Sequence, residues 1–260
     1  MKKVIKKFIS KKNYSAIMRW KNIFFNDYAI KSYSQEGEDM ILRRLFETKK
    51  NGFYIDVGAH HPKRFSNTYY FYKIGWRGIN IDAMPGSMKL FNKIRPRDIN
   101  LEEAVSDKIE KLTYHIFNEP ALSGFSEELI TKRDGKNDYH VIDTIDLKAK
   151  TLSEILERYI LNEQDIDFLN VDAEGFDYRV LAGNDWQKFH PKVILFEELN
   201  SVLLDKYISP SRKLLEINGY IPYAKTVNTV FFIDKNYYNK LIKNKLNEKE
   251  SKSCKRSISR

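Results

Sequence analysis

The sequence is poor in cysteine and has no long uncharged apolar run. Its single cysteine among 260 residues is Cys254, which excludes an internal disulfide framework and a cysteine-rich zinc site. This cysteine usage favours a reducing, cytoplasmic location. Because no long uncharged run occurs, we expect neither a membrane-spanning helix nor the apolar region of a secretory signal.

Acidic residues are scarce at both ends of the chain. Residues 1–31 carry nine Lys or Arg against one acid, and residues 235–260 carry nine against two. The ends therefore carry +8 and +7, and since the whole chain carries +10, the middle is at −5. An acidic middle does not favour a nucleic-acid partner. The basic ends are either solvated or touch an anionic partner, such as the inner face of a membrane.

The composition predicts one α/β domain between two extensions. With 42% hydrophobic residues, the chain can bury the core of a single domain. Residues 1–31 mix Lys pairs with apolar residues at helical spacing, which predicts an amphipathic helix on a membrane surface or on the body. We place the domain at 32–234 and a polar, basic tail at 235–260.

A short strand that ends in a glycine turn organises this domain. Residues 53–57 form an apolar run that contains Asp56 and precedes Gly58, which predicts a buried strand and a tight turn. A carboxylate in a buried strand costs free energy unless it is paired. Ligands of open α/β sheets bind at the carboxyl ends of strands, so Asp56 either contacts a ligand or caps the turn.

Later strands are also predicted to end in carboxylates. These are Asp82 after 78–82, Asp172 after 166–172, and Glu197 and Glu198 after 193–198. At one edge of a sheet such acids would line a crevice suited to a cation, a polyhydroxyl ligand or a divalent metal. An acid at the position of Asp82 holds ribose hydroxyls in α/β nucleotide-binding folds. The turn at Gly58 lacks the further glycines of G-x-G-x-x-G, which favours a nucleoside cofactor without phosphates.

Four other regions complete the prediction. A helix at 34–48 places Glu38 in its first turn, where the helix dipole favours an acid, although Glu38 could instead contact a ligand. Residues 111–147 interrupt the strand–helix alternation, and their loop at 120–130 is a candidate acceptor-binding insertion. A third strand is expected at 99–105. Two strands within 219–234 are joined by a connection too short for a crossover helix, so they are predicted to be antiparallel.

The ordered set of motifs resembles the FkbM-type S-adenosylmethionine-dependent methyltransferases. The runs are YSQEGED (33–39), FYIDVGAHHP (53–62), GINID (78–82), EAVSD (103–107), LNVDAEGFD (169–177) and NTVFF (228–232). The resemblance covers about 33–234. It implies a Rossmann-like class I methyltransferase fold, α/β, with a seven-stranded, mostly parallel sheet and an antiparallel last strand.

The resemblance also implies a site for S-adenosyl-L-methionine. Asp56 and Gly58 would lie beside the methionine part, and Asp82 would hold the ribose hydroxyls. Ser106 or Asp107 would flank the adenine. Asp172 would lie near the amino group or the methyl-transfer centre. His60 and His61 depart from the family pattern, because small residues are common at their positions.

The implied reaction is methyl transfer to a hydroxyl of a small molecule or glycan, such as a sugar or a secondary metabolite. The protein mainly aligns the reactants, and an alcohol acceptor also needs a base. The candidates are His60, His61 and Asp172; histidine has the better pKa, but the two histidines could instead hydrogen-bond the turn. No metal is assigned. The alternatives are a nucleic-acid methyltransferase recruited by the basic ends and a non-catalytic, glycan- or membrane-associated member.

Overall fold

The computed structural model describes residues 10–25, 28–160, 164–199, 201–203 and 209–244. The chain divides into two compact units, Met1–Ser32 and Tyr33–Arg260. The first unit contains the helix α2 (Lys11–Phe25), which confirms the predicted helix for these residues, whereas 1–9 lie outside the described residues. No helix in the described ranges is long and apolar enough to cross a bilayer.

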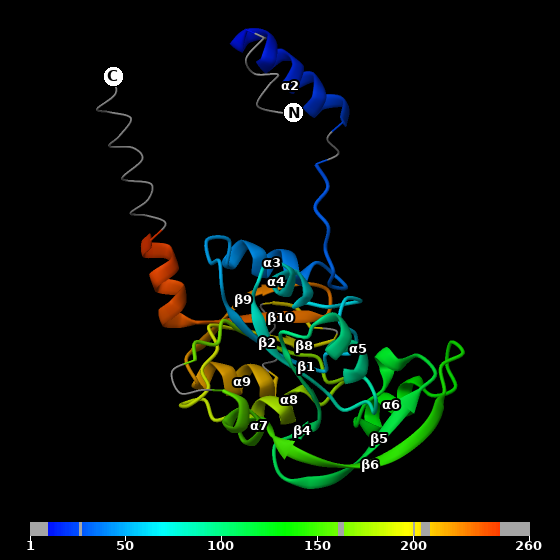
Figure 1. Cartoon of the computed structure of the whole chain (residues 1–260). Helices are drawn as coiled ribbons and strands as arrows, with labels where there is room; N and C mark the ends of the chain where they lie inside the picture. The colour runs from blue at the N-terminus through cyan, green and yellow to red at the C-terminus, as the bar shows by residue number, and fades with distance from the viewer. Residues whose placement is uncertain (1–9, 26–27, 161–163, 200, 204–208, 245–260) are drawn as a thin grey trace. The chain divides into compact units, whose positions relative to one another are not determined.

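Seven strands of the second unit form one sheet in the order β3-β2-β1-β7-β8-β10-β9 (Figure 1). Four neighbouring pairs are parallel, and β10 runs antiparallel to both β8 and β9. The predicted sheet and its antiparallel last strand are therefore confirmed. The strands are β1 (Phe53–Val57), β2 (Arg77–Asp82), β3 (Ile99–Glu102), β7 (Phe168–Val171), β8 (Val193–Glu197), β9 (Tyr220–Lys225) and β10 (Thr229–Asp234).

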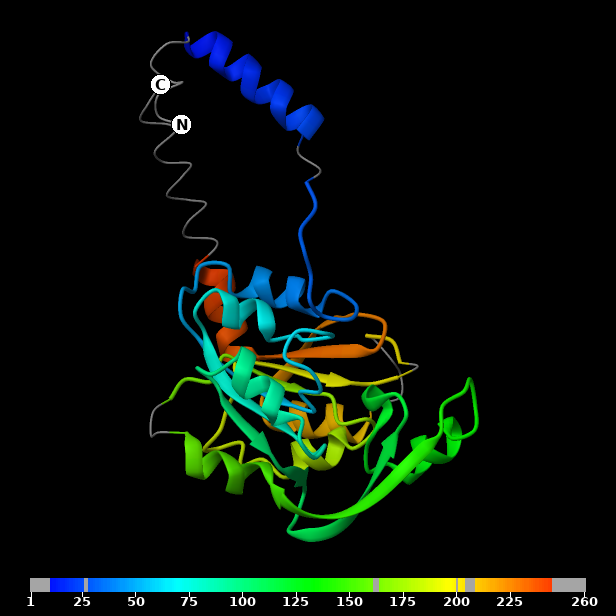
Figure 2. The same ribbon diagram turned by 45° about the vertical axis from the view of Figure 1, so that its right-hand side comes forward.

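Helices cover both faces of this sheet (Figures 1 and 2). Successive side chains of a strand point to opposite faces, so Tyr54 packs with α3 and α4 while Ile55 packs with α7, α8 and α9. Both faces are therefore buried, as the continuous apolar runs of the strands require. The helices are α3 (Glu38–Leu45), α4 (Tyr69–Lys73), α5 (Met88–Ile94), α7 (Leu152–Tyr159), α8 (Asp177–Ala182) and α9 (Pro210–Ile217).

The expected strand at 99–105 is wrong as a single element. It breaks at Glu103, whose amide donates to the carbonyl oxygen of Asp82 at 3.1 Å. After this residue β4 (Ala104–Ser106) leaves the main sheet and pairs with β6 (Val141–Thr151). With β5 (Glu110–Phe117), these strands form a second, three-stranded sheet.

The region 111–147 forms a long hairpin of β5 and β6 that extends from the body (Figure 2). Its connection contains the 3-10 helix η1 (Pro120–Leu122) and α6 (Glu127–Arg133). The predicted interruption of the strand–helix alternation is confirmed, because two antiparallel strands with no helix packed between them on the main sheet occupy this fully described region.

The segment after β10 differs from the predicted polar tail. Residues 235–244 are helical, and Tyr237, Tyr238 and Leu241 pack against the core on the α3 side of the sheet. These three residues lie at i, i+1 and i+4 and form a half-buried stripe in an otherwise polar segment. The remaining tail residues, 245–260, lie outside the described residues.

A capping box at the start of α7 gives a test of the local fold. Thr151 Oγ1 accepts from the Glu154 amide at 3.2 Å, and Glu154 Oε2 accepts from the Thr151 amide at 3.1 Å. Thr151→Ala removes the cap, so we expect the free energy of unfolding to fall by about 1 kcal/mol. Chemical denaturation measures it. Thr131→Ala, in the exposed part of α6, is the control and should change stability by less than about 0.5 kcal/mol.

Candidate functional site

A cavity of about 500 Å³ lies at the carboxyl ends of β1, β2 and β7. Its volume is typical of sites for small molecules. Asp56, Asp82 and Asp172 all line it, so three acids predicted to share one crevice do so. The other two do not line it. Glu198 is paired with Arg212 at 2.5 Å, and Glu197 is the last residue of β8.

Asp56 is buried at the end of β1 and has two hydrogen-bond donors. The Asn170 side-chain amide donates to Oδ1 at 2.8 Å, and the Thr68 hydroxyl donates to Oδ2 at 2.7 Å. Burial raises the pKa of Asp56, while the charge of Arg95 and these hydrogen bonds oppose the rise. The carboxylate is thus held in one orientation, with part of its surface facing the cavity.

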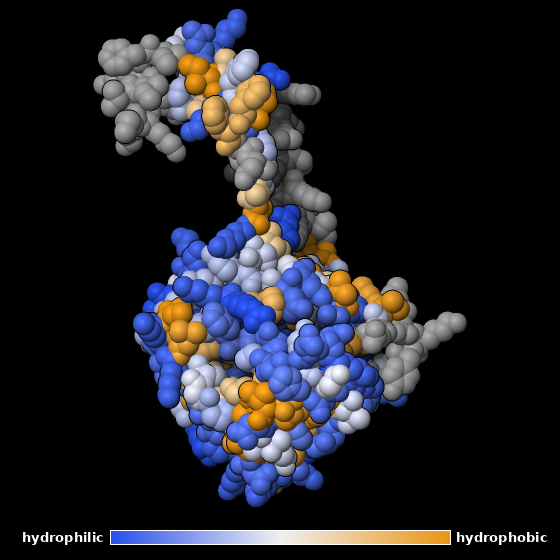
Figure 3. All heavy atoms as spheres, turned by 90° about the vertical axis from the view of Figure 1, so that its right-hand side faces the viewer, coloured by the Kyte–Doolittle hydropathy of each residue, from blue (hydrophilic) through white to orange (hydrophobic). Residues whose placement is uncertain are grey.

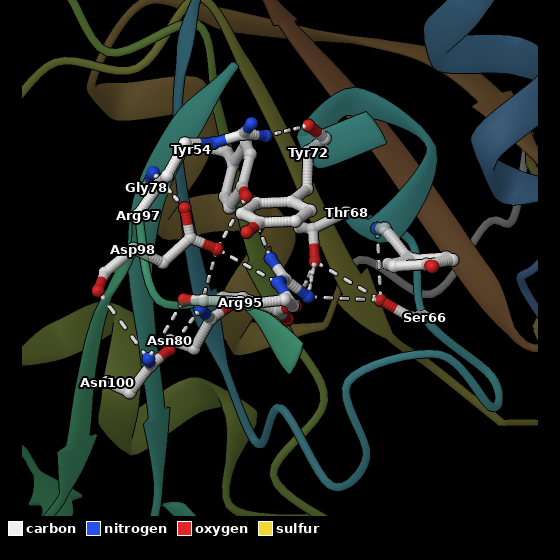
Figure 4. A network of polar contacts seen from close by, with 12 residues as sticks. Tyr54, Ser66, Thr68, Tyr72, Gly78, Asn80, Arg95, Arg97, Asp98 and Asn100 are labelled. Carbon is white, nitrogen blue, oxygen red and sulfur yellow. Dashed lines mark hydrogen bonds and ion pairs between the residues drawn. The ribbon is translucent and has the colours of Figure 1, made fainter. Parts of the chain in front are cut away.

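A buried polar network reaches Asp56 through Thr68. Figure 4 shows this network around Arg95. The Arg95 guanidinium is fully buried and donates to Asp98 at 2.8 Å, to the Tyr54 hydroxyl at 2.8 Å and to Thr68 Oγ1 at 3.0 Å. Asp98 also accepts from the Gly78 amide at 3.0 Å. A buried ion pair is tolerated when its remaining polar atoms are satisfied. Through Thr68 this network fixes the donor that orients Asp56.

Asp82 ends β2 and accepts one backbone amide on each carboxylate oxygen. The donors are His60 at 2.7 Å and Met84 at 2.8 Å. Burial raises the pKa of Asp82 to about 6, and these two amides oppose the rise. Each oxygen keeps a lone pair, so the carboxylate can accept from two neighbouring hydroxyls as well.

Gly58 allows the ends of β1 and β7 to approach each other. Its φ is +77°, and a Cβ atom at this residue would lie 1.7 Å from the carbonyl oxygen of Asp172. Only glycine fits here, because a side chain would overlap the backbone and would also be strained at this φ. The single glycine retained in the turn is therefore explained by the neighbouring strand end.

Asp172 is open to the cavity yet surrounded by protein atoms and other acids. Burial raises the pKa of Asp172 well above its ordinary value, and the carboxylates of Glu174 and Glu197 raise it further. Burial and the carboxylates of Glu174 and Asp177 raise the pKa of Glu197 to about 8. Glu174 is partly neutralised by Arg133 of α6 at 2.5 Å. The wall next to Asp172 therefore favours a positively charged ligand group.

The two histidines after Gly58 differ in their contacts. His61 Nδ1 accepts from the amides of Lys63 and Arg64 at 3.0 and 2.9 Å, so a neutral ring carries its proton on Nε2 and has no free lone pair for a base. His60 has a left-handed φ of 51°. Its Nε2 is buried and has no hydrogen-bond partner among the described residues. Burial and the charge of Arg64 lower the pKa of both rings.

Three predicted cofactor residues do not line the cavity. Ser106 donates to Asp107 at 3.0 Å and to Glu110 at 2.8 Å, and Asp107 pairs with Arg179 at 2.5 Å. Glu38 is buried at the start of α3 and accepts from the Thr226 hydroxyl at 2.7 Å. The structure therefore gives these residues roles in packing, and it does not support their contact with a cofactor.

Other cavity residues were missed by the sequence analysis. Glu103 and Val105 line the wall where Ser106 and Asp107 were expected, because the chain turns at Glu103. Tyr114, Gly124 and Phe125 enter the lining from the hairpin. Their contribution depends on how the hairpin folds back over the sheet, and no local sequence pattern encodes that. The loop at 120–130 was the one signal that pointed to it.

The residues fit a nucleoside that carries a positive charge. Asp82 has acceptor capacity for two ribose hydroxyls, the glycine turn brings backbone close to the cavity, and the acids around Asp172 favour a cation. S-adenosyl-L-methionine, a sulfonium with an unphosphorylated ribose, needs these features in its binding site. In the parts of the chain that the structure describes, no group of His, Cys, Asp or Glu is arranged to hold a metal ion.

The sheet order and the acids at three strand ends define a Rossmann-like methyltransferase. Residues 56–221 match the family model described as Methyltransferase FkbM domain. The chain therefore belongs to the FkbM methyltransferase family, and its cofactor is S-adenosyl-L-methionine.

One solved structure of similar fold is a TehB-like SAM-dependent methyltransferase from Corynebacterium glutamicum. It matches with a TM-score of 0.40 and 11% identity, over 86% of this chain and 97% of that chain. No curated protein matches the sequence significantly. The assignment of the chain to the FkbM family therefore rests on the match to the family model.

Gly58→Ala tests the close approach of β1 and β7. The substitution places a methyl group against the Asp172 carbonyl, so we expect the free energy of unfolding to fall by several kcal/mol. Gly219→Ala is the matched control, because Gly219 has a φ of +87° and nothing within 4 Å of an added Cβ. It should cost only about 1 kcal/mol of backbone strain. Equal losses in the two variants, measured by chemical denaturation, would contradict the steric account.

Asp82 predicts a pH dependence of cofactor binding. The ionised carboxylate accepts from ribose hydroxyls and the protonated form does so less well, so affinity is lost as the pH falls through about 6. From pH 7.5 to 5 the affinity for S-adenosylhomocysteine should fall about tenfold for one such group. Calorimetry measures it. Asp82→Asn should bind weakly and lose this part of the pH dependence, whereas Asp146→Asn, exposed on the hairpin, should keep it.

Proposed function

We propose that this methyltransferase is an O-methyltransferase that acts on a hydroxyl of a sugar, glycan or secondary metabolite. The observation that supports the proposal most directly is the state of Asp172. Its carboxylate is open to the cavity, and among the described residues none donates a hydrogen bond to it. Burial and the neighbouring acids raise the pKa of Asp172 well above its ordinary value. A hydroxyl acceptor needs such a base, because its proton must leave as the new bond forms.

The other two candidate bases are less suited. His61 uses its acceptor nitrogen for the turn. His60 keeps an unpartnered Nε2, but this atom is buried, so an acceptor could reach it only after the turn rearranged. Asp172 is therefore our choice for the residue that takes the proton.

The neighbouring residues prepare Asp172 for this role. When bound, S-adenosyl-L-methionine supplies the electrophilic methyl group. Asp82 would orient the ribose, and Asp56 and Gly58 would position the methionine portion. Positive charge beside Asp172 lowers the pKa of this carboxyl group, so the loaded site favours its ionised form. The hairpin residues Tyr114 and Phe125 add aromatic lining to the cavity, which would limit water around the reacting groups.

The second candidate, a nucleic-acid methyltransferase, receives no support from the cavity. Its rim carries acids and the middle of the chain is at −5, which repels a phosphate backbone. A non-catalytic role is also disfavoured, because Asp56, Asp82 and Asp172 share one open cavity and packing alone does not require them there.

Methyl transfer to a panel of acceptors tests the proposal. Purified protein and methyl-labelled cofactor are incubated with mono- and oligosaccharides, phenols, primary amines and RNA, and incorporated label is counted. We expect label only in hydroxyl-bearing compounds. Transfer only to amines or RNA would contradict the proposal, and so would the absence of S-adenosylhomocysteine binding at millimolar concentration.

Asp172→Asn tests the assigned base. For an accepted hydroxyl compound we expect kcat to fall by about 10² or more, with the affinity for S-adenosylhomocysteine changed by only a few-fold. The acid limb of the pH–rate profile should also disappear. His61→Gln keeps an acceptor for the turn amides and is the control, which should retain most of kcat. A variant Asp172→Asn with unchanged kcat would exclude Asp172 as the base.

A further inference from the structure

We propose that α2 is a membrane-surface helix, which docks the enzyme on a bilayer that contains anionic lipid. The inference does not depend on the acceptor or on the identity of the base. It rests on the helix itself, on the side chains that this helix exposes and on the charge of the segment that carries it.

The apolar side chains of α2 are exposed. This distinguishes it from the helices of the second unit, such as α7, whose Leu152, Ile155 and Leu156 are almost completely buried. Apolar surface gathers on α2 in the space-filling view (Figure 3). The residues and their exposed fractions are Ile17 52%, Trp20 67%, Ile23 60%, Phe24 62% and Phe25 85%. An exposed apolar patch of this kind marks an interaction site.

The spacing places these side chains on one broad face. Ile17, Trp20 and Phe24 lie at i, i+3 and i+7, which is one stripe of an α-helix, and the rings of Trp20 and Phe24 stack with centroids 4.7 Å apart. Lys12 and Arg19 are exposed and project away from this stripe, whereas the exposed Lys21 flanks it at i+4 from Ile17. An apolar face that contains Trp and Phe beneath a basic polar face is the pattern of helices that lie in a membrane interface.

The charge of this segment favours an anionic bilayer over a second copy of the chain as the partner of α2. Residues 1–31 carry +8, which attracts an anionic bilayer surface and opposes the close approach of a second copy. A nucleic acid would satisfy the basic residues but would leave Ile17, Ile23 and Phe25 in water. Since no described helix can cross a bilayer, α2 would lie on the surface.

Trp20 provides a direct readout in the full-length protein. Of the three tryptophans, Trp20 is 67% exposed, whereas Trp76 and Trp186 are 1% and 8% exposed. Vesicles of phosphatidylcholine with phosphatidylglycerol should shift the emission to shorter wavelength and carry the protein into the pellet on sedimentation. Pure phosphatidylcholine vesicles should do so much less, and added salt should weaken binding. Trp20→Phe should sediment with the vesicles but show no shift.

Two double variants distinguish vesicle binding by the apolar face of α2 from nonspecific binding by other exposed apolar residues. Trp20→Ser with Phe24→Ser should lower the partition coefficient by about tenfold or more and leave the thermal unfolding midpoint unchanged. The control is Ile217→Ser with Val227→Ser, two residues of the second unit that are 84% and 74% exposed. It should bind vesicles as the wild type does.

Four outcomes would overturn the proposal. They are an unshifted Trp20 emission with anionic vesicles, wild-type binding by the α2 double variant, RNA binding without vesicle binding, and dimerisation through α2 without vesicle binding.

Discussion

The carboxylate of Asp56 is buried at the end of β1, and the site is organised by the need to satisfy it. A buried, unpaired carboxylate is costly, and two side chains meet the cost: Asn170 from β7 and Thr68 from the segment before α4. Thr68 is in turn fixed by Arg95, which is neutralised by Asp98. One carboxylate thus links strands that are far apart in the sequence and fixes the rim on which the cavity is built.

The acids around the cavity are not equivalent, and their differences follow from their partners. Asp56 has side-chain donors and Asp82 has amide donors, so each is held in one orientation. Asp172 faces further acids instead. A fixed carboxylate recognises a ligand, whereas a carboxylate with a raised pKa and an open face can exchange a proton. One cavity therefore combines groups suited to holding a nucleoside with one suited to chemistry.

What the sequence predicted correctly was encoded locally. Apolar runs that end in Asp56, Asp82 and Asp172 identify strand ends, and parallel topology then brings those ends to one edge. The failures involve distant partners. Ser106 and Asp107 follow the third strand as expected, but the break at Glu103 moves them to a second sheet, where Arg179 of α8 pairs with Asp107. Similarly, the helix at 235–244 has a polar composition and is stabilised by three residues that reach the core.

The hairpin of β5 and β6 forms a wall of the cavity that is separate from the proposed cofactor residues. None of the residues that fit the nucleoside or its cation lies on it, yet it adds Tyr114, Gly124 and Phe125 to the lining. Gly124 packs against the Cβ of Glu174, where an added methyl group would lie 3.2 Å away, and Arg133 pairs with the carboxylate of Glu174. The hairpin is therefore attached beside Asp172, the residue that we propose as the base. A change in its loop would alter the wall of the cavity beside Asp172 and leave the carboxylates of β1 and β2 in place.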